Sequence, residues 1–97
     1  MDEDNPRDLA RVHIWVTGRV QGVGFRAFVL QAGQMFGLRG WVHNFGYDQV
    51  ETVAEGSRSV LEQFIQVVKT GPRASRVDEA IVEWEEPAGE FHQFTVV

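Results

Sequence analysis

The residues with the clearest chemical use lie in one short segment, residues 18–26, which reads Gly-Arg-Val-Gln-Gly-Val-Gly-Phe-Arg. Its glycines allow a loop to curl so that backbone N–H groups converge, and such a concavity binds anions. Where the loop leads into a helix, the unpaired amides of the first turn and the positive end of the helix dipole add to this attraction. Arg26, in that first turn, can donate two parallel hydrogen bonds to a phosphate. The segment therefore predicts a phosphate site, with a plain glycine-rich turn as the alternative.

The distribution of charge along the chain favours an anionic ligand for this segment. The 97 residues carry a formal net charge of −5, yet residues 9–47 contain no Asp or Glu and hold four arginines. The acids are confined to residues 1–8 and 48–97. An acid-free stretch in an acidic protein does not repel a phosphate, although chance could also produce it. The negative total argues against nucleic acid as a partner.

The chain offers few other groups for catalysis or metal binding. It has no cysteine, which excludes disulfides, thiolate metal sites and thiol nucleophiles. His13, His43 and His92 are far apart in sequence and lack the spacing of metal ligands. We therefore expect each to be a half-exposed strand residue, and we expect the protein to bind neither a metal nor a cofactor. No apolar run approaches the roughly 20 residues of a membrane span, and the polar, acidic start is not a signal peptide. We therefore expect no membrane contact and a cytoplasmic location.

Hydrophobic periodicity predicts the elements that must position this segment. Apolar residues alternate with polar ones over 11–17, which predicts a strand, and they recur at helical spacing from Phe25 until Gly37. The same patterns predict the remaining elements, which are strands over 39–45, 49–55, 76–84 and 91–97 and a helix over 58–70. Gly46-Tyr47-Asp48 marks the turn of a hairpin between two of these strands.

The order of the elements is strand, helix, strand, strand, helix, strand, with a short terminal strand. This βαββαβ order predicts an α+β ferredoxin-like sandwich, in which two helices cover one face of an antiparallel sheet. We expect one domain over residues 9–97, preceded by a flexible acidic tail over residues 1–8. The second helix has two candidate starts, because Ser59 with Glu62 fits a capping box and Ser57 could cap instead.

Three other nucleotide or nucleic-acid motifs fit the sequence poorly. Gly22-x-Gly24-x-x-Ala27 matches a loose dinucleotide fingerprint, but a hairpin follows the helix and the chain is too short for a doubly wound sheet. The Walker pattern fails because no Lys-Ser or Lys-Thr follows the glycines. Arg39-Gly40-Trp41-Val42 resembles the aromatic strand motif of RNA-recognition modules, but it falls on the second strand instead of the third.

Two longer patterns resemble the signatures of the acylphosphatase family. The first is Gly18-x-Val20-Gln21-Gly22-Val23-x-Phe25-Arg26, and the second is Gly37-Leu38-x-Gly40-Trp41-Val42-x-Asn44. Later positions that also fit are Val50-Glu51, Gly56, Gly71-Pro72, Val77 and Phe94-x-Val96. The resemblance runs from about residue 11 to the end of the sequence, and it implies the ferredoxin-like sandwich as the fold.

The resemblance implies a role for each matched residue. Arg26 matches the family's substrate-phosphate arginine, and Asn44 matches the asparagine that positions the attacking water. The backbone of the loop matches the phosphate cradle: Gly18, Arg19, Val20, Gln21, Gly22, Val23 and Gly24. The implied reaction is hydrolysis of an acyl phosphate to a carboxylate and inorganic phosphate, by in-line attack of water and without a cofactor. The chain departs from the family at Tyr47-Asp48, where Asp-Gly is common, and at Gly24, where other members can carry a side chain.

The implied partner is a small-molecule acyl phosphate, with inorganic phosphate or sulfate as a product-like ligand, bound by a monomer. Two other functions stay open. One is a non-catalytic phosphate- or partner-binding module on the same fold. The other is a domain for carbamoyl-phosphate chemistry in hydrogenase maturation, as the first part of a much longer chain. A 97-residue chain that ends just after its last strand argues against the latter.

Overall fold

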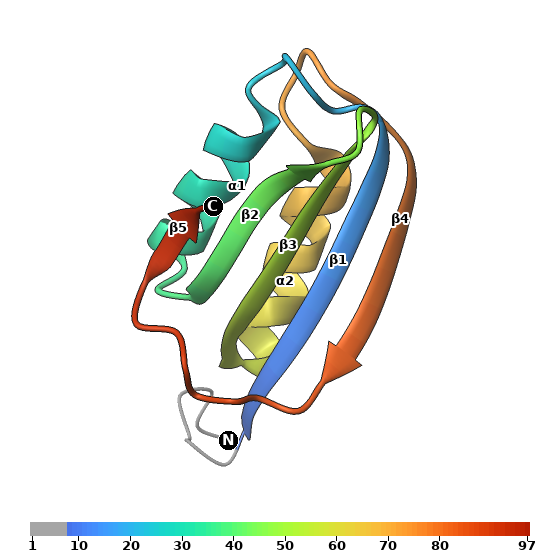
Figure 1. Cartoon of the computed structure of the whole chain (residues 1–97). Helices are drawn as coiled ribbons and strands as arrows, with labels where there is room; N and C mark the ends of the chain where they lie inside the picture. Colours follow the sequence, from blue (N-terminus) through green and yellow to red (C-terminus); the bar gives the residue numbers. More distant parts are fainter. Residues whose placement is uncertain (1–7) are drawn as a thin grey trace.

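The computed structural model describes residues 8–97, and in this part of the chain two helices pack on one face of a five-stranded sheet (Figure 1). The elements are β1 (Leu9–Arg19), α1 (Phe25–Met35), β2 (Arg39–Phe45), β3 (Gln49–Ser57), α2 (Arg58–Thr70), β4 (Arg76–Glu85) and β5 (Phe94–Val96). This order confirms the predicted α+β ferredoxin-like sandwich. The tail predicted over residues 1–8 lies outside the described residues except for Asp8. Within residues 8–97 no helix is long and apolar enough to cross a membrane.

The strands follow the order β4-β1-β3-β2-β5 across the sheet. β1 pairs antiparallel with β3 and β4, and β2 pairs antiparallel with β3. β5 instead runs parallel to β2, with Phe94 opposite Gly40, so the sheet is mixed rather than wholly antiparallel. The last strand is shorter than the predicted 91–97, because residues 86–93 cross one end of the sheet from β4 to the edge formed by β2 (Figure 1).

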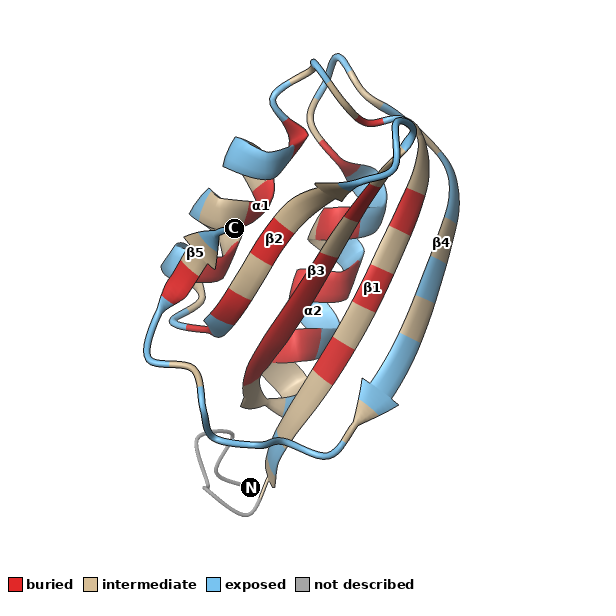
Figure 2. Cartoon of the chain, in the orientation of Figure 1, coloured by how far each residue is buried: buried red, intermediate tan, exposed pale blue. Residues whose placement is uncertain are grey.

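The core lies between the sheet and the two helices, as the alternation in β1 predicts. Val12, Ile14 and Val16 are at most 1% exposed and belong to the central cluster. The helices contribute further buried side chains to this cluster: Phe25, Val29, Leu61, Phe64, Ile65 and Val68. Figure 2 shows buried bands on the inner strands that alternate with partly exposed ones. This packing fixes β1, β2 and α1, the three elements that carry the predicted site.

The start of α2 differs from the predicted capping box. The helix begins at Arg58, so Ser59 lies inside it, and Ser57, with φ −68° and ψ 146°, is the N-cap residue. Neither serine caps the helix, since Oγ of both is buried without a hydrogen-bond partner in the described chain. Glu62 approaches Arg58 at 3.9 Å instead of completing a box. The prediction for Ser59 is wrong because a residue with helical backbone angles cannot act as the N-cap.

Candidate functional site

The link from β1 to α1 is a glycine loop, residues 20–24, at one end of the sheet (Figure 1). Gly22 and Gly24 have φ of 73° and 80°, a left-handed conformation that favours glycine. Gly24 is also the N-cap of α1, and its carbonyl accepts a hydrogen bond from the Phe28 amide at 3.0 Å. No side chain of the described chain caps this helix, and its first turn holds no acidic residue. The amides before Phe28 therefore have no acceptor within the helix, and an anion can accept from them.

A pocket of about 380 Å³ lies between this loop, the start of α1 and the end of the sheet. Its lining residues are Val20, Gly22, Gly24, Phe25, Arg26, Ala27, Leu30, Asn44 and Val96. The fold thus brings Arg26 on α1 and Asn44 on β2 to one pocket, as the matched signatures predict. A volume of this size suits a small molecule.

Only part of the predicted phosphate cradle lines this pocket. The lining members are Val20, Gly22 and Gly24. Gly18 and Arg19 are the last residues of β1, and the Gly18 amide already donates to the Asp48 carbonyl at 3.1 Å. Val23 packs against the core, and the Gln21 side chain is hydrogen-bonded to the hairpin between β2 and β3. Within the predicted 18–24, the Gly18 amide is thus already paired inside the fold, and phosphate binding by the other backbone amides stays a prediction.

The pocket carries a positive charge and no acidic side chain. None of its lining residues is Asp or Glu, and the acidic stretch 48–97 contributes only Val96. Arg26 is exposed, and no carboxylate within residues 8–97 forms an ion pair with it. Arg58 and Arg76, in contrast, each pair with a nearby acid. The five N–H donors of the Arg26 guanidinium thus remain available to a ligand.

Asn44 lies half-buried near the end of β2, opposite Val50 of β3. Its Oδ1 atom is buried and has no hydrogen-bond partner among the described residues. Buried polar atoms in folded proteins are usually paired, and an unpaired one calls for an explanation. Because Asn44 also lines the pocket, a bound molecule or a water there can provide the missing partner.

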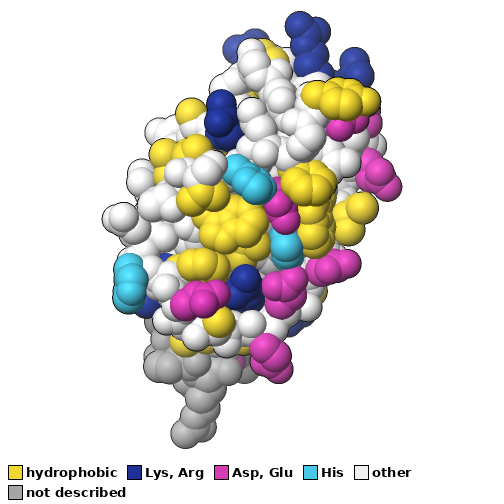
Figure 3. All heavy atoms as spheres, in the orientation of Figure 1, with side chains coloured by type: hydrophobic (Ala, Val, Ile, Leu, Met, Phe, Trp, Pro, Cys, Tyr) yellow, Lys and Arg dark blue, Asp and Glu magenta, His cyan; other side chains and the backbone are white. Residues whose placement is uncertain are grey.

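The uncovered face of the sheet holds a cluster of histidines and acids (Figure 3). Nε2 of His13 and Nε2 of His43 lie 2.5 and 2.6 Å from the two carboxylate oxygens of Glu51. Nδ1 of His13 lies 3.0 Å from a carboxylate oxygen of Glu85. Burial acts to raise the pKa of Glu51, but the hydrogen bonds and charges of His43 and His13 outweigh it and hold the pKa below its usual value.

His13 and His43 are half-exposed strand residues, as expected, but the fold also brings both to Glu51, which their separation in the sequence does not show. His43 and Glu51 are directly opposite in the pairing of β2 with β3, a register that the turn at residues 46–48 already indicates. His92 departs from the expectation, because it is exposed and precedes β5 instead of lying in a strand, and it forms no part of the cluster. No group of three or more potential ligands within residues 8–97 is arranged to hold a metal ion. His13 alternates with the buried Val12 of β1, so the cluster lies on the sheet face away from the helices and from the pocket.

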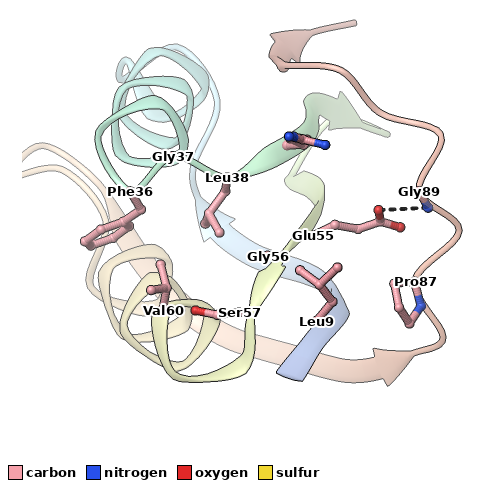
Figure 4. A pocket seen from close by; sticks show the side chains of 11 residues that line it. Leu9, Phe36, Gly37, Leu38, Glu55, Gly56, Ser57, Val60, Pro87 and Gly89 are labelled. Atoms are coloured by element: carbon pink, nitrogen blue, oxygen red, sulfur yellow. Dashed lines mark hydrogen bonds between the residues drawn. The ribbon is translucent and has the colours of Figure 1, made fainter. Parts of the chain in front are cut away.

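A second pocket, of about 290 Å³, lies at the opposite end of the sheet, beside the start of β1 and of α2 (Figure 4). Its acidic residue, Glu55, accepts hydrogen bonds from the amides of Ala88 at 2.8 Å and Gly89 at 3.2 Å. This carboxylate holds the segment that crosses the end of the sheet. Arg39 lines this pocket too, but the carboxylate of Glu55 lies opposite it on the neighbouring strand and would repel a phosphate, so the pocket is a poorer candidate for the predicted site than the first.

Known proteins with similar sequences and structures agree with the signatures. A family model described as Acylphosphatase matches residues 12–96. An acylphosphatase of Trichormus variabilis is 47% identical over 81 residues, which cover 84% of this chain and 80% of that relative. The crystal structure of acylphosphatase from Bacillus subtilis matches with a TM-score of 0.86 and 39% identity, over 91% of this chain and 98% of that one. Full-length HypF, crystallised in a phosphate- and nucleotide-bound form, matches with a TM-score of 0.80 and 34% identity, over 92% of this chain and 12% of HypF.

Proposed function

The chain belongs to the acylphosphatase family, and we propose that its phosphate site is the pocket formed by the glycine loop, Arg26 and Asn44. As an acylphosphatase it hydrolyses the carboxyl-phosphate bond of acyl phosphates to a carboxylate and inorganic phosphate. One observation carries the assignment of the site. An arginine without an acidic partner and a buried amide oxygen without a hydrogen bond, both judged within residues 8–97, line one pocket that has no acidic side chain.

In this proposal Arg26 and backbone amides hold the phosphate group of the substrate. The guanidinium donates two hydrogen bonds to phosphate oxygens, and the amides at the start of α1 donate further ones. Phosphoryl transfer passes through a loose transition state in which negative charge is spread over the three equatorial oxygens. Donors that are already in place stabilise that charge without rearrangement, so positioning and electrostatics supply the catalysis.

Asn44 orients the water that attacks phosphorus in line with the leaving carboxylate. A new bond forms between the water oxygen and phosphorus, while the bond from phosphorus to the carboxylate oxygen breaks. A carboxylate leaves readily, so the step needs no strong general acid, and the lining residues include no carboxylate, histidine or thiol. The proton that the water loses passes to an oxygen of the transferred phosphate.

Phosphate binding and turnover, measured on the same variants, test this site. The rate of acetyl phosphate hydrolysis and the affinity for inorganic phosphate are measured for the wild type, Arg26→Ala and Asn44→Ala. We expect Arg26→Ala to lose both phosphate affinity and turnover, and Asn44→Ala to lose turnover while phosphate still binds. If both variants bind phosphate and turn over like the wild type, the pocket is not the site.

Carbamoyl phosphate is a second candidate substrate. It belongs to the alternative of a carbamoyl-phosphate domain within a much longer chain, and the similarity to a part that makes up 12% of the HypF chain favours testing it. Competition between carbamoyl phosphate and acetyl phosphate for the wild-type enzyme separates the two. A carbamoyl phosphate kcat/KM well above that of acetyl phosphate would favour the second candidate.

We further propose that the enzyme works as a monomer in the cytoplasm and binds inorganic phosphate or sulfate as a product-like ligand. Within residues 8–97 the sheet and both helices share one hydrophobic cluster, which supports a self-sufficient subunit. Sedimentation velocity, fractionation of the source cells and calorimetric titration with phosphate and with sulfate test the three parts. A stable dimer, a membrane or secreted pool, or the absence of anion binding would contradict the corresponding part.

A further inference from the structure

The side chain of Gln21 joins the two halves of the proposed site. Its Nε2 atom donates to the Gly46 carbonyl at 3.0 Å and to the Gln49 carbonyl at 2.9 Å. Gln21 belongs to the glycine loop, whereas Gly46 and Gln49 flank the turn between β2 and β3. One primary amide nitrogen therefore uses both of its N–H groups to hold both ends of this turn.

The turn that Gln21 holds follows closely after Asn44. Asn44 precedes Gly46 by two residues on the same strand end, and Phe45 opposite Gln49 is the last pair between β2 and β3. The turn has little other support, since Tyr47 is 90% exposed and Gly46 has a left-handed φ of 65°. The sheet holds Asn44 opposite Val50, so the hydrogen bonds from Gln21 set where the loop lies relative to this end of β2.

A third hydrogen bond reaches the same turn, but it comes from the end of β1 and not from the loop. The Gly18 amide donates to the Asp48 carbonyl at 3.1 Å, which ties the end of β1 to the turn. Gln21 extends this tie into the loop itself, next to Val20 and Gly22, which line the pocket. Of the side chains within residues 8–97, Gln21 is the one in the loop that hydrogen-bonds to the hairpin.

We infer that Gln21 is a positioning residue, which sets the distance between the phosphate-binding loop and the Asn44 side chain. This inference rests on the proposed roles of Arg26 and Asn44. In-line attack depends on the separation of the attacking water from the phosphate, and a misplacement of about 1 Å can cost roughly a hundredfold in rate. The Gln21 side chain touches neither the attacking water nor the phosphate in this account, and it acts through Asn44. Its loss therefore lowers turnover more than it lowers phosphate binding.

The residue type fits this role. Methionine has a similar length but donates no hydrogen bond, so the turn loses both crossing bonds. Glutamate has the same shape but, when ionised, offers only acceptors to two carbonyl oxygens. Gln21→Met and Gln21→Glu therefore remove the same hydrogen bonds in two different ways. Gln63→Met, on the exposed face of α2, is the matched control.

The test measures kcat and KM for acetyl phosphate and the inhibition constant of inorganic phosphate. We expect both Gln21 variants to lower kcat about tenfold or more, with KM and the inhibition constant within about twofold of the wild type. Gln63→Met leaves all three constants unchanged. Urea unfolding of each variant establishes that it is folded under the assay conditions, and if neither Gln21 variant folds, the residue serves the fold and the inference is overturned.

A double-mutant cycle with Asn44→Ala separates positioning from a merely structural role. If Gln21 acts through Asn44, Gln21→Met has little further effect on kcat in the Asn44→Ala background. An undiminished loss of kcat in that background, a matching rise in KM and the phosphate inhibition constant, or an unchanged kcat in Gln21→Met would each overturn the inference. Full turnover of Asn44→Ala alone would instead overturn the proposed role of Asn44, whatever Gln21→Met does.

Discussion

Replacing Arg26 tests the charge on which phosphate binding depends. Arg26 is the one Lys or Arg among the lining residues, and no carboxylate within residues 8–97 neutralises it, so alanine removes the positive side chain of the pocket. Removing one preorganised donor to developing charge costs about 3–4 kcal/mol, or roughly 10²–10³ in rate. The side chain is exposed and therefore partly screened by salt, which places the expected loss in kcat/KM near a hundredfold.

Arg26→Lys separates the charge from the geometry. Lysine keeps the positive charge but cannot donate two parallel hydrogen bonds to a phosphate. We expect it to recover less than about a tenth of the wild-type kcat/KM, with phosphate inhibition weaker than in the wild type. The assay is release of inorganic phosphate from acetyl phosphate, or loss of benzoyl phosphate absorbance, over a range of inorganic phosphate concentrations.

Arg19→Ala provides the matched control, because Arg19 is exposed at the end of β1 and does not line the pocket. Its replacement should change kcat/KM by less than about threefold, through long-range attraction that salt abolishes. An Arg26→Ala enzyme within tenfold of the wild type would refute this reasoning. So would an Arg19→Ala enzyme that loses as much activity as Arg26→Ala.

Four further changes probe the rest of the site and the fold. Asn44→Ala should lower kcat about a hundredfold with KM within threefold, because the water loses its orienting group; steady-state kinetics that show full turnover would contradict this. Gly24→Ala should lower the free energy of unfolding by about 1–2 kcal/mol, because φ is 80° although a Cβ meets no atom within 4 Å. Gly89→Ala, with φ 69° and equally open space, should lose the same stability in urea. Because the folded-state pKa of Glu51 is lowered, its carboxylate stabilises the fold above the usual value of 4.5, and this contribution is lost as pH falls through the lowered pKa. Glu51→Gln should therefore flatten the acid side of a plot of unfolding free energy against pH, and parallel curves for variant and wild type would argue against it.

The meeting of the loop and Asn44 could be predicted from the sequence together with topology. β1 and β2 both pair antiparallel with β3, so they run in the same direction and end at the same end of the sheet. The loop follows β1, and Asn44 lies near the end of β2. Period-two alternation and helical spacing are local signals. They therefore predict the helices and strands directly, beginning with the strand that contains Val12, Ile14 and Val16.

The features that the sequence does not reveal depend on contacts between segments that are far apart in the sequence. The direction of β5 follows from how residues 86–93 cross the sheet, and no local pattern encodes that path. The Gly18 amide was expected to face phosphate, but it pairs with Asp48, a contact that exists only once the hairpin has folded back on β1. The hydrogen bond from Gln21 to Gly46 likewise joins two segments that are far apart in the sequence. The motif therefore identifies Gln21 but does not predict its hydrogen-bond partners.

A crystal structure of the protein with inorganic phosphate tests the central claim most directly. The account predicts phosphate in the pocket, bonded to amides of the glycine loop and the start of α1 and to the Arg26 guanidinium, with Asn44 facing it across a water. Phosphate bound only outside this pocket, for example beside Arg39 at the opposite end of the sheet, would contradict the assignment of the site.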